Sequence, residues 1–350
     1  MPNPLQMAVI GQGRIGVLHS LHVQELANET GACRLAAVVD TRMDRAEAAA
    51  ARLSQSQDSP VRPFPSIAAM LEAGVAEASL VATPTACHRS NAAELVAAGH
   101  RILLEKPLTG SLDEDREFAR ELDARHPNAI MLAFQRRFDA PLRHARELME
   151  SGAIGRVFKI VSILEDSNPA PDGYVSGGIL ADMSVHNVDE ILWLLGRTPT
   201  AAAAIGNCLY SRKLSTAVED YDDALLYLWF PSELAAQISV TRNHVSGYRV
   251  ETWIFGEKGQ IHVGRFEQKP RDIVVEAYGR AETIARQTYK QRDYGERLPE
   301  FVDRFGAAYK AEAAEFIERC NSGAPFSVTH NDGLRAMEVI HMASRRFVTP

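Results

Sequence analysis

Apolar residues form short continuous runs in the first third of the chain, and amphipathic stretches separate these runs. Continuous apolar runs of this length are typical of parallel strands buried on both faces. We predict strands at residues 7–10, 35–39, 61–64, 78–82, 101–104 and 129–134. Helices are predicted directly after the first strand, at residues 42–57, 66–73 and 88–98, and from residue 111. The regular alternation indicates a doubly wound parallel sheet, an α/β domain covering residues 1–130.

The pattern changes after residue 130. Helices are predicted at residues 141–150, 182–195, 299–321 and 332–346, and strands at residues 157–164, 224–230, 234–241, 249–255 and 260–263. Strands that follow one another without helices between them suggest a mostly antiparallel sheet. We therefore predict a C-terminal α+β domain at residues 131–350, with a large open sheet. We expect this domain to bind the substrate and, through an uncovered sheet face, to form a homo-oligomer, either a dimer or a tetramer.

A glycine-rich turn joins the first predicted strand to the first predicted helix. Gly11, Gly13 and Gly16 have the spacing G-x-G-x-x-G, which is typical of a dinucleotide-binding Rossmann domain when it follows a strand and opens a helix. In such a site the first glycine permits the turn, the second admits a pyrophosphate and the third allows close helix packing. Phosphates bind at the helix N-terminus, so we count Arg14 and Ile15 among the cofactor-binding residues.

The second predicted strand ends in Asp40, a position from which a carboxylate accepts hydrogen bonds from the adenosine ribose. A carboxylate also repels the 2′-phosphate of NADP. Two unit charges about 5 Å apart, at an effective dielectric constant of about 20, interact by roughly 3 kcal/mol. We therefore expect NAD as the cofactor, although Arg42 carries the opposite charge nearby and leaves NADP use open.

Polar residues follow two later strands of the same predicted sheet. Thr83 and Pro84 follow one strand and precede His88, which opens the next helix, while Glu105 and Lys106 follow the other strand and precede a proline. Ligands of open α/β sheets lie beyond the carboxyl ends of the strands. We therefore expect all five residues to contact the cofactor. The alternative for Glu105 and Lys106 is a solvated charge pair.

Composition and charge narrow the class of protein. The chain has 350 residues, of which 46% are hydrophobic and 24% charged, as in an ordinary soluble enzyme of two domains. Its net charge of -7 argues against a nucleic acid or an anionic membrane as the main partner. The four cysteines are scattered without C-x-x-C spacing, and we find no signal peptide and no apolar run of about 18 residues. We expect a cytoplasmic protein.

A second group of polar residues lies at residues 177–189, GGILADMSVHNVD. Asp182 and His186 have i,i+4 spacing on a predicted helix, so their side chains can reach a common point. An ordinary surface pair, a core histidine and part of a metal site are alternatives, but no cluster supplies further ligands and we predict no metal. The functional interpretation is a base and its orienting carboxylate. Oxidation of an alcohol needs such a base, and histidine titrates near pH 6.5.

These three motifs together, G-x-G-x-x-G, E-K-P at residues 105–107 and G-G-x-x-x-D-x-x-x-H, resemble the Gfo/Idh/MocA oxidoreductase family over nearly the whole chain. Residues 135–139, 168–171 and 305–334 look most like its inositol 2-dehydrogenase branch. The resemblance implies that Lys106, Asp182 and His186 form the catalytic group. His186 would accept the proton, Lys106 would bind the reacting hydroxyl group, and Asp182 would hold both substrate and lysine.

The resemblance also implies that Arg136, Tyr248 and Asn168 bind substrate, with Asp166 as an alternative to Asn168. A surface arginine and a core aromatic are the other interpretations of the first two. We expect an NAD-dependent dehydrogenase that oxidises a secondary hydroxyl group of a cyclic polyol or sugar, with a myo-inositol-type substrate favoured. Another sugar or a dihydrodiol as substrate, a redox-cycling enzyme with tightly held cofactor, and a redox-silent nucleotide- and sugar-binding sensor remain alternatives.

Overall fold

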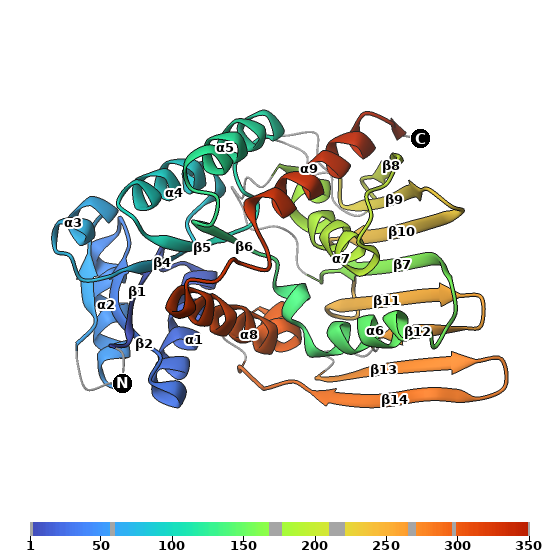
Figure 1. The fold of residues 1–350 in the computed structure, drawn as a ribbon, viewed down its shortest axis with the longest axis horizontal. Coiled ribbons are helices and arrows are strands. Elements are labelled where there is room, and N and C mark those ends of the chain that lie inside the picture. The colour runs from blue at the N-terminus through green and yellow to red at the C-terminus, as the bar shows by residue number, and fades with distance from the viewer. Residues whose placement is uncertain are drawn as a thin grey trace. The chain divides into compact units, whose positions relative to one another are not determined.

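The structure, a computed structural model, describes residues 3–56, 60–167, 177–209, 221–264, 271–295 and 299–348 (Figure 1). The chain forms two compact units. Unit 1 comprises Met1–Phe134 and Tyr309–Leu334, and unit 2 comprises Gln135–Ala308 and Arg335–Pro350. Residues 309–334, which the sequence pattern assigned to the C-terminal domain, thus pack with unit 1. Helical periodicity identifies a buried face but not the core on which that face packs.

Unit 1 is built on a parallel sheet of six strands in the order β3-β2-β1-β4-β5-β6. The strands are β1 (Leu5–Ile10), β2 (Cys33–Val39), β3 (Arg62–Phe64), β4 (Ala78–Val81), β5 (Arg101–Glu105) and β6 (Ile130–Ala133). Every residue of β4 and β6 is buried, as expected for strands covered on both faces. The predicted doubly wound sheet is confirmed, and its order reverses between β1 and β4, where open α/β sheets bind ligands.

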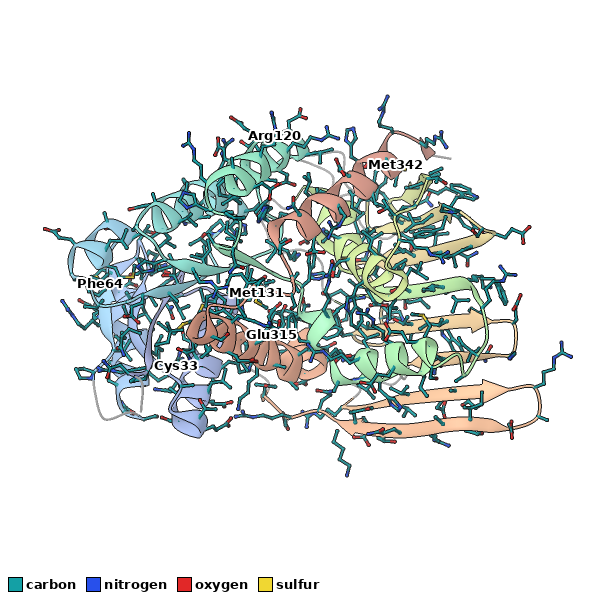
Figure 2. All side chains as sticks on the ribbon, in the orientation of Figure 1. Cys33, Phe64, Arg120, Met131, Glu315 and Met342 are labelled. Carbon is teal, nitrogen blue, oxygen red and sulfur yellow. The ribbon has the colours of Figure 1, made fainter. Side chains whose placement is uncertain are left out.

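Helices connect the strands of unit 1. They are α1 (Arg14–Thr30), α2 (Met43–Ser54), α3 (Ile67–Glu72), the short η1 (Thr85–Cys87), α4 (His88–Ala97) and α5 (Leu112–Arg125). The hydroxyl groups of Ser66 and Ser111 cap α3 and α5. Figure 2 shows Met131 in the interior of this unit and Arg120 on the outer side of α5.

The C-terminal segment of unit 1 contains the end of α8 (Glu300–Ser322) and the start of α9 (His330–Ser344). Arg101 of β5 donates hydrogen bonds to the carbonyl oxygens of Arg319 and Ala324, the latter at 2.7 Å. Thr329 forms a bridge with Met131 in β6. The segment therefore completes the edge of the parallel sheet.

Unit 2 contains a sheet of nine strands in the order β14-β13-β12-β11-β7-β10-β9-β8-β15. They are β7 (Val157–Glu165), β8 (Ala201–Asn207), β9 (Asp223–Phe230), β10 (Leu234–Thr241), β11 (Arg249–Gly256), β12 (Gly259–Val263), β13 (Asp272–Gly279), β14 (Thr283–Lys290) and β15 (Phe347–Val348). Neighbours are antiparallel except in the pairs β7–β10 and β8–β15. The predicted α+β unit with a mostly antiparallel sheet is confirmed.

Helices cover one face of this sheet, with α6 (Ala140–Glu150) against β12 and β13, and α7 (Val185–Leu195) against β7 and β10. Along β9, Ala224, Leu226 and Leu228 are buried, whereas Leu225 is 51% and Trp229 is 42% exposed. Successive strand residues point to opposite faces. The second face of the sheet therefore carries large apolar side chains at the surface of the unit.

Candidate active site

The glycine turn after β1 has the geometry of a phosphate-binding loop. Gly11 has a φ of +89°, and a Cβ atom there would lie 2.7 Å from the carbonyl oxygen of Ala82. A Cβ atom on Gly16 would overlap the carbonyl oxygen of Gly11, whereas a Cβ atom on Gly13 would meet nothing within 4 Å. Two of the glycines are therefore required by packing, and the third faces open space.

That open space lies at the start of α1, where Gly13 is the N-cap residue. No side chain in the described part of the chain caps this helix, and its first turn contains no acidic residue. The first N–H groups of a helix and its positive dipole end attract anions. Arg14 and Ile15 contribute the backbone at this end, so the loop fits a pyrophosphate.

Asp40 lies directly after β2 and is held against the glycine turn. Its carboxylate accepts hydrogen bonds from the backbone N–H groups of Gln12, at 2.8 Å, and Arg42, at 2.9 Å. The guanidinium of Arg42 pairs instead with Asp44 at 2.7 Å, and both side chains are exposed. The geometry thus fixes an acceptor beside the phosphate loop, as recognition of a ribose requires.

His88 lies in the interior rather than at a surface. It is 1% exposed, with Nδ1 2.7 Å from the carbonyl oxygen of Pro107 and Nε2 2.9 Å from that of Thr83. Burial lowers the pKa of His88, while the two carbonyl contacts oppose this shift. The hydroxyl group of Thr83 accepts a hydrogen bond from Asn91 at 3.0 Å. His88 therefore joins the turn at residues 83–84 to the segment at residues 105–107.

Glu105 is the last residue of β5 and Lys106 follows it, so the strand ends one residue later than the sequence predicted. Glu105 is not a solvated charge, because its Oε1 lies 2.8 Å from Nε2 of the buried His19 in α1. Lys106 is half-buried and precedes Pro107 through a cis peptide bond. These residues, like the glycine turn and Asp40, belong to unit 1.

Asp182 and His186 belong to unit 2, where the chain departs from the predicted helix. Residues 180–184 form a π-helical turn, η3 (Leu180–Ser184), and α7 begins only at Val185. The prediction of one helix over residues 182–195 is corrected in this respect. Single π turns are frequent at functional sites, because they redirect side chains from one helix face. Both Asp182 and His186 are half-buried.

Arg242, which the sequence analysis did not single out, lies next to Asp182. Its Nη2 is 3.3 Å from Oδ2 of Asp182, and both side chains are largely buried. Arg242 follows β10, outside any recognisable motif. The only sequence signal was its position directly after a predicted strand.

Arg136 and Arg137 lie in the short helix η2 (Gln135–Phe138) and face two consecutive acids of α7. Arg136 is 2% exposed, and its Nη1 lies 2.7 Å from Oε2 of Glu190. Arg137 Nε donates to Asp189 at 3.0 Å. Arg136 is therefore not a surface residue, and its charge is balanced inside unit 2.

Tyr248 is largely buried before β11, and its backbone N–H donates to Glu300 at 2.8 Å. Burial raises the pKa of its hydroxyl group, while the nearby Arg136 opposes this effect. Asp166 follows β7 and binds the Thr241 carbonyl oxygen through its own N–H, at 2.8 Å. Asn168, the other predicted substrate ligand, lies outside the described residues.

No group of three or more His, Cys, Asp or Glu side chains among the described residues could hold a metal ion. None of the helices described is long and apolar enough to cross a membrane.

Comparison with known proteins gives two family matches and similar relatives. Residues 5–133 match the oxidoreductase family with an NAD-binding Rossmann fold, and residues 142–262 match the GFO/IDH/MocA C-terminal domain. Inositol 2-dehydrogenase of Rhizobium meliloti is 30% identical, over 97% of this chain and 96% of that protein. Scyllo-inositol 2-dehydrogenase (NAD(+)) of Bacillus subtilis is 28% identical, over 99% and 95%. The structure of scyllo-inositol dehydrogenase from Lactobacillus casei, with NAD(H) and scyllo-inositol, shares the fold, with a TM-score of 0.80, 22% identity and coverage of 98% and 97%.

Proposed function

Because the chain belongs to the Gfo/Idh/MocA family of oxidoreductases and uses NAD, we propose that it oxidises a secondary hydroxyl group of a neutral cyclic polyol, with an inositol as the substrate. The names of relatives that match it from end to end support a substrate of this class. The phosphate loop and the fixed acceptor at Asp40 are consistent with the cofactor.

The charge balance of unit 2 is the observation that carries the proposal of a neutral substrate. Arg136 pairs with Glu190, and Arg242 pairs with Asp182. Arg304 binds both carboxylate oxygens of Asp139, each at 2.8 Å, and is buried. An anionic substrate would need an uncompensated cation, whereas hydroxyl groups need hydrogen-bond partners.

Arg136 also retains hydrogen-bonding capacity. Its Nε and Nη2 atoms are buried and have no hydrogen-bond partner among the described residues. Buried N–H groups without a partner are costly, and a bound hydroxyl oxygen or a water molecule would satisfy them. Arg136 therefore supports binding of a hydroxylated, uncharged ring through donors rather than through net charge.

The reaction removes a hydride from the carbinol carbon and a proton from its hydroxyl group, and NAD supplies the hydride acceptor when bound. We assign the proton to His186, because imidazole is a base near neutral pH. Lys106 is assigned to the reacting oxygen, where an ammonium group stabilises alkoxide character. Asp182 is assigned to orientation of the substrate. These roles rest on the family motifs that carry the three residues.

The test is NAD reduction, followed by absorbance, with myo-, scyllo- and chiro-inositol, common aldoses and a dihydrodiol. We expect turnover with an inositol and a loss of about a hundredfold or more in kcat for His186→Ala. His126→Ala, a change at an exposed histidine that ends α5, is the control and should leave kcat unchanged. Binding of NAD without turnover of any compound would favour the sensor, and nucleotide retained through purification would favour the redox-cycling enzyme.

We also propose that the face of the nine-stranded sheet opposite α6 and α7 forms a homo-oligomer in the cytoplasm. Ile205, Leu225 and Trp229 on β8 and β9 are large, apolar and exposed. Patches of this kind mark protein interfaces. The replacement Trp229→Glu should lower the molar mass measured by light scattering, and an unchanged mass would exclude this face.

A further inference from the structure

Two buried histidines contact the segment at residues 105–107 from its two ends. His19 of α1 is 0% exposed, and its Nε2 lies 2.8 Å from the carboxylate of Glu105. His88 contacts the carbonyl oxygen of Pro107 at 2.7 Å. Lys106 is the residue between these two contacts. All five residues belong to unit 1.

The contact of His19 defines which ring nitrogen donates to Glu105. Its Nδ1 is buried and has no hydrogen-bond partner in the described part of the chain, whereas Nε2 faces a carboxylate oxygen. Because a carboxylate only accepts, Nε2 is the donor. The ring is also packed edge-to-face on Tyr309, with centroids 5.6 Å apart, so its direction is fixed.

The contacts of His88 tie the same segment to a second loop. Both ring nitrogens lie against carbonyl oxygens, those of Pro107 and Thr83. A neutral imidazole donates to one of them, and a protonated imidazole donates to both. In either state the ring links the turn after β4 to the turn after β5.

We infer that His19 and His88 are positioning residues that hold the two neighbours of Lys106, through the Glu105 carboxylate and the Pro107 carbonyl group, and so set where the lysine amine lies. His19 connects the lysine segment to the helix that begins at the phosphate loop, and His88 connects it to the turn at residues 83–84. These contacts keep Lys106 at a constant position relative to the phosphate loop and the turn at residues 83–84, both of which are assigned to the nucleotide. Both histidines are buried, His19 at 0% and His88 at 1% exposed.

The inference rests on the proposed role of Lys106, so its test needs one readout that is independent of turnover. Backbone hydrogen exchange of residues 105–109, followed by mass spectrometry, is that readout. The variants are His19→Leu and His88→Leu, which remove the contacts. His19→Gln keeps a donor near Nε2, and His88→Asn keeps a donor near Nδ1. The matched control is His100→Leu, because His100 is also buried in unit 1 and hydrogen-bonds the Ser79 hydroxyl at 2.9 Å.

In the two Leu variants we expect faster exchange confined to residues 105–109, with a fall of about ten- to a hundredfold in kcat, because small displacements of a catalytic group have effects of this size. His19→Gln and His88→Asn should recover most of kcat. His100→Leu should lower Tm without either effect.

Unchanged exchange at residues 105–109, or changed exchange with unchanged kcat, would overturn the inference. Hydrogen exchange could instead rise across the whole of unit 1, and as strongly in His100→Leu as in the other variants. Both histidines would then be ordinary core residues, and this result would also overturn the inference. If the wild-type protein oxidises no polyol, the proposed function fails. The exchange experiment still decides whether the two histidines hold the segment.

Discussion

The buried ion pair between Arg136 and Glu190 makes a quantitative prediction for unit 2. The two side chains are 2% and 0% exposed and lie 2.7 Å apart. Glu190 also accepts hydrogen bonds from Thr252 at 2.6 Å and from Ser162 at 3.3 Å. Glu190→Gln keeps the size of the side chain but leaves the guanidinium charge buried and uncompensated. Removal of one partner of such a pair costs about 3–5 kcal/mol, and we expect a loss of this size in the free energy of unfolding.

Tryptophan fluorescence during urea unfolding measures this loss selectively. The three tryptophans of the chain, at positions 193, 229 and 253, all belong to unit 2. Protein concentration must be equal in all samples, because association would stabilise the folded state. The control is Glu150→Gln. Its Arg146 partner also lies at 2.7 Å, but the two side chains are 54% and 34% exposed, so the expected change is at most about 0.5 kcal/mol.

A free energy of unfolding of Glu190→Gln within about 1 kcal/mol of the wild-type value would refute the reasoning. It would mean that the ion pair is not buried in solution. The double replacement Arg136→Met with Glu190→Leu separates stability from function. An apolar pair should restore part of the lost stability, because neither charge is then left alone, while the buried hydroxyl groups of Thr252 and Ser162 lose their acceptor. If that stable variant no longer oxidises the polyol, the donors of Arg136 act on the substrate.

Three further predictions concern the glycine turn, the cofactor and acid stability. Gly16→Ala should prevent folding of unit 1, because the added Cβ atom would overlap the backbone. Gly13→Ala should leave the circular dichroism and Tm of the protein unchanged and raise the KM for NAD about tenfold or more. Equal effects of the two changes would contradict this division. Asp40→Ala should reduce the preference for NAD over NADP, by up to about a hundredfold, and an unchanged kcat/KM ratio would mean that its carboxylate does not touch the ribose. Burial alone would raise the pKa of Glu251, but the neighbouring His262, hydrogen bonds from Arg249 and Trp253, and the charge of the Arg249 guanidinium lower it to about 2. The pKa is thus lower in the folded than in the unfolded protein, so this stabilisation is present above about pH 4.5 and is lost as the pH falls toward 2. Glu251→Gln should flatten this decline in urea titrations at stepwise pH, and parallel curves would contradict the assignment.

Much of the fold could be predicted because buried strands and helix faces consist mainly of apolar residues, whose spacing is visible in the sequence. Strands β4 and β6 are buried on both faces, and each was visible as a continuous apolar run. Strand β14 was missed, because most of its side chains are exposed and its sequence TIARQTYK has no alternation. Its position depends on pairing with β13, and backbone pairing is not visible in side-chain polarity.

Part of the candidate site could likewise be predicted from the sequence, and part could not. Asp40 and the glycines could be placed from sequence because a strand, a turn and a helix that follow directly fix their geometry. The partners of the predicted site residues could not, because they come from distant segments. Arg242 reaches Asp182 across 60 positions, and Glu190 meets Arg136 across 54. Such pairs depend on how helices and strands pack, which the sequence does not show directly. The catalytic and binding roles assigned to these residues stay predictions.

The pairing of charges changes what the arginines of unit 2 imply. Arg136, Arg242 and Arg304 are three arginines of unit 2, and arginine is the usual partner of carboxylates and phosphates. In the structure each guanidinium already has a carboxylate partner within the unit. A second anion at these arginines would add a negative charge beside a buried carboxylate with no cation left to balance it, at a cost of several kcal/mol. Hydroxyl groups avoid this cost because they accept from guanidinium N–H groups and donate to carboxylates without a change of net charge. The same arrangement that stabilises unit 2 therefore favours an uncharged polyol over an acidic sugar.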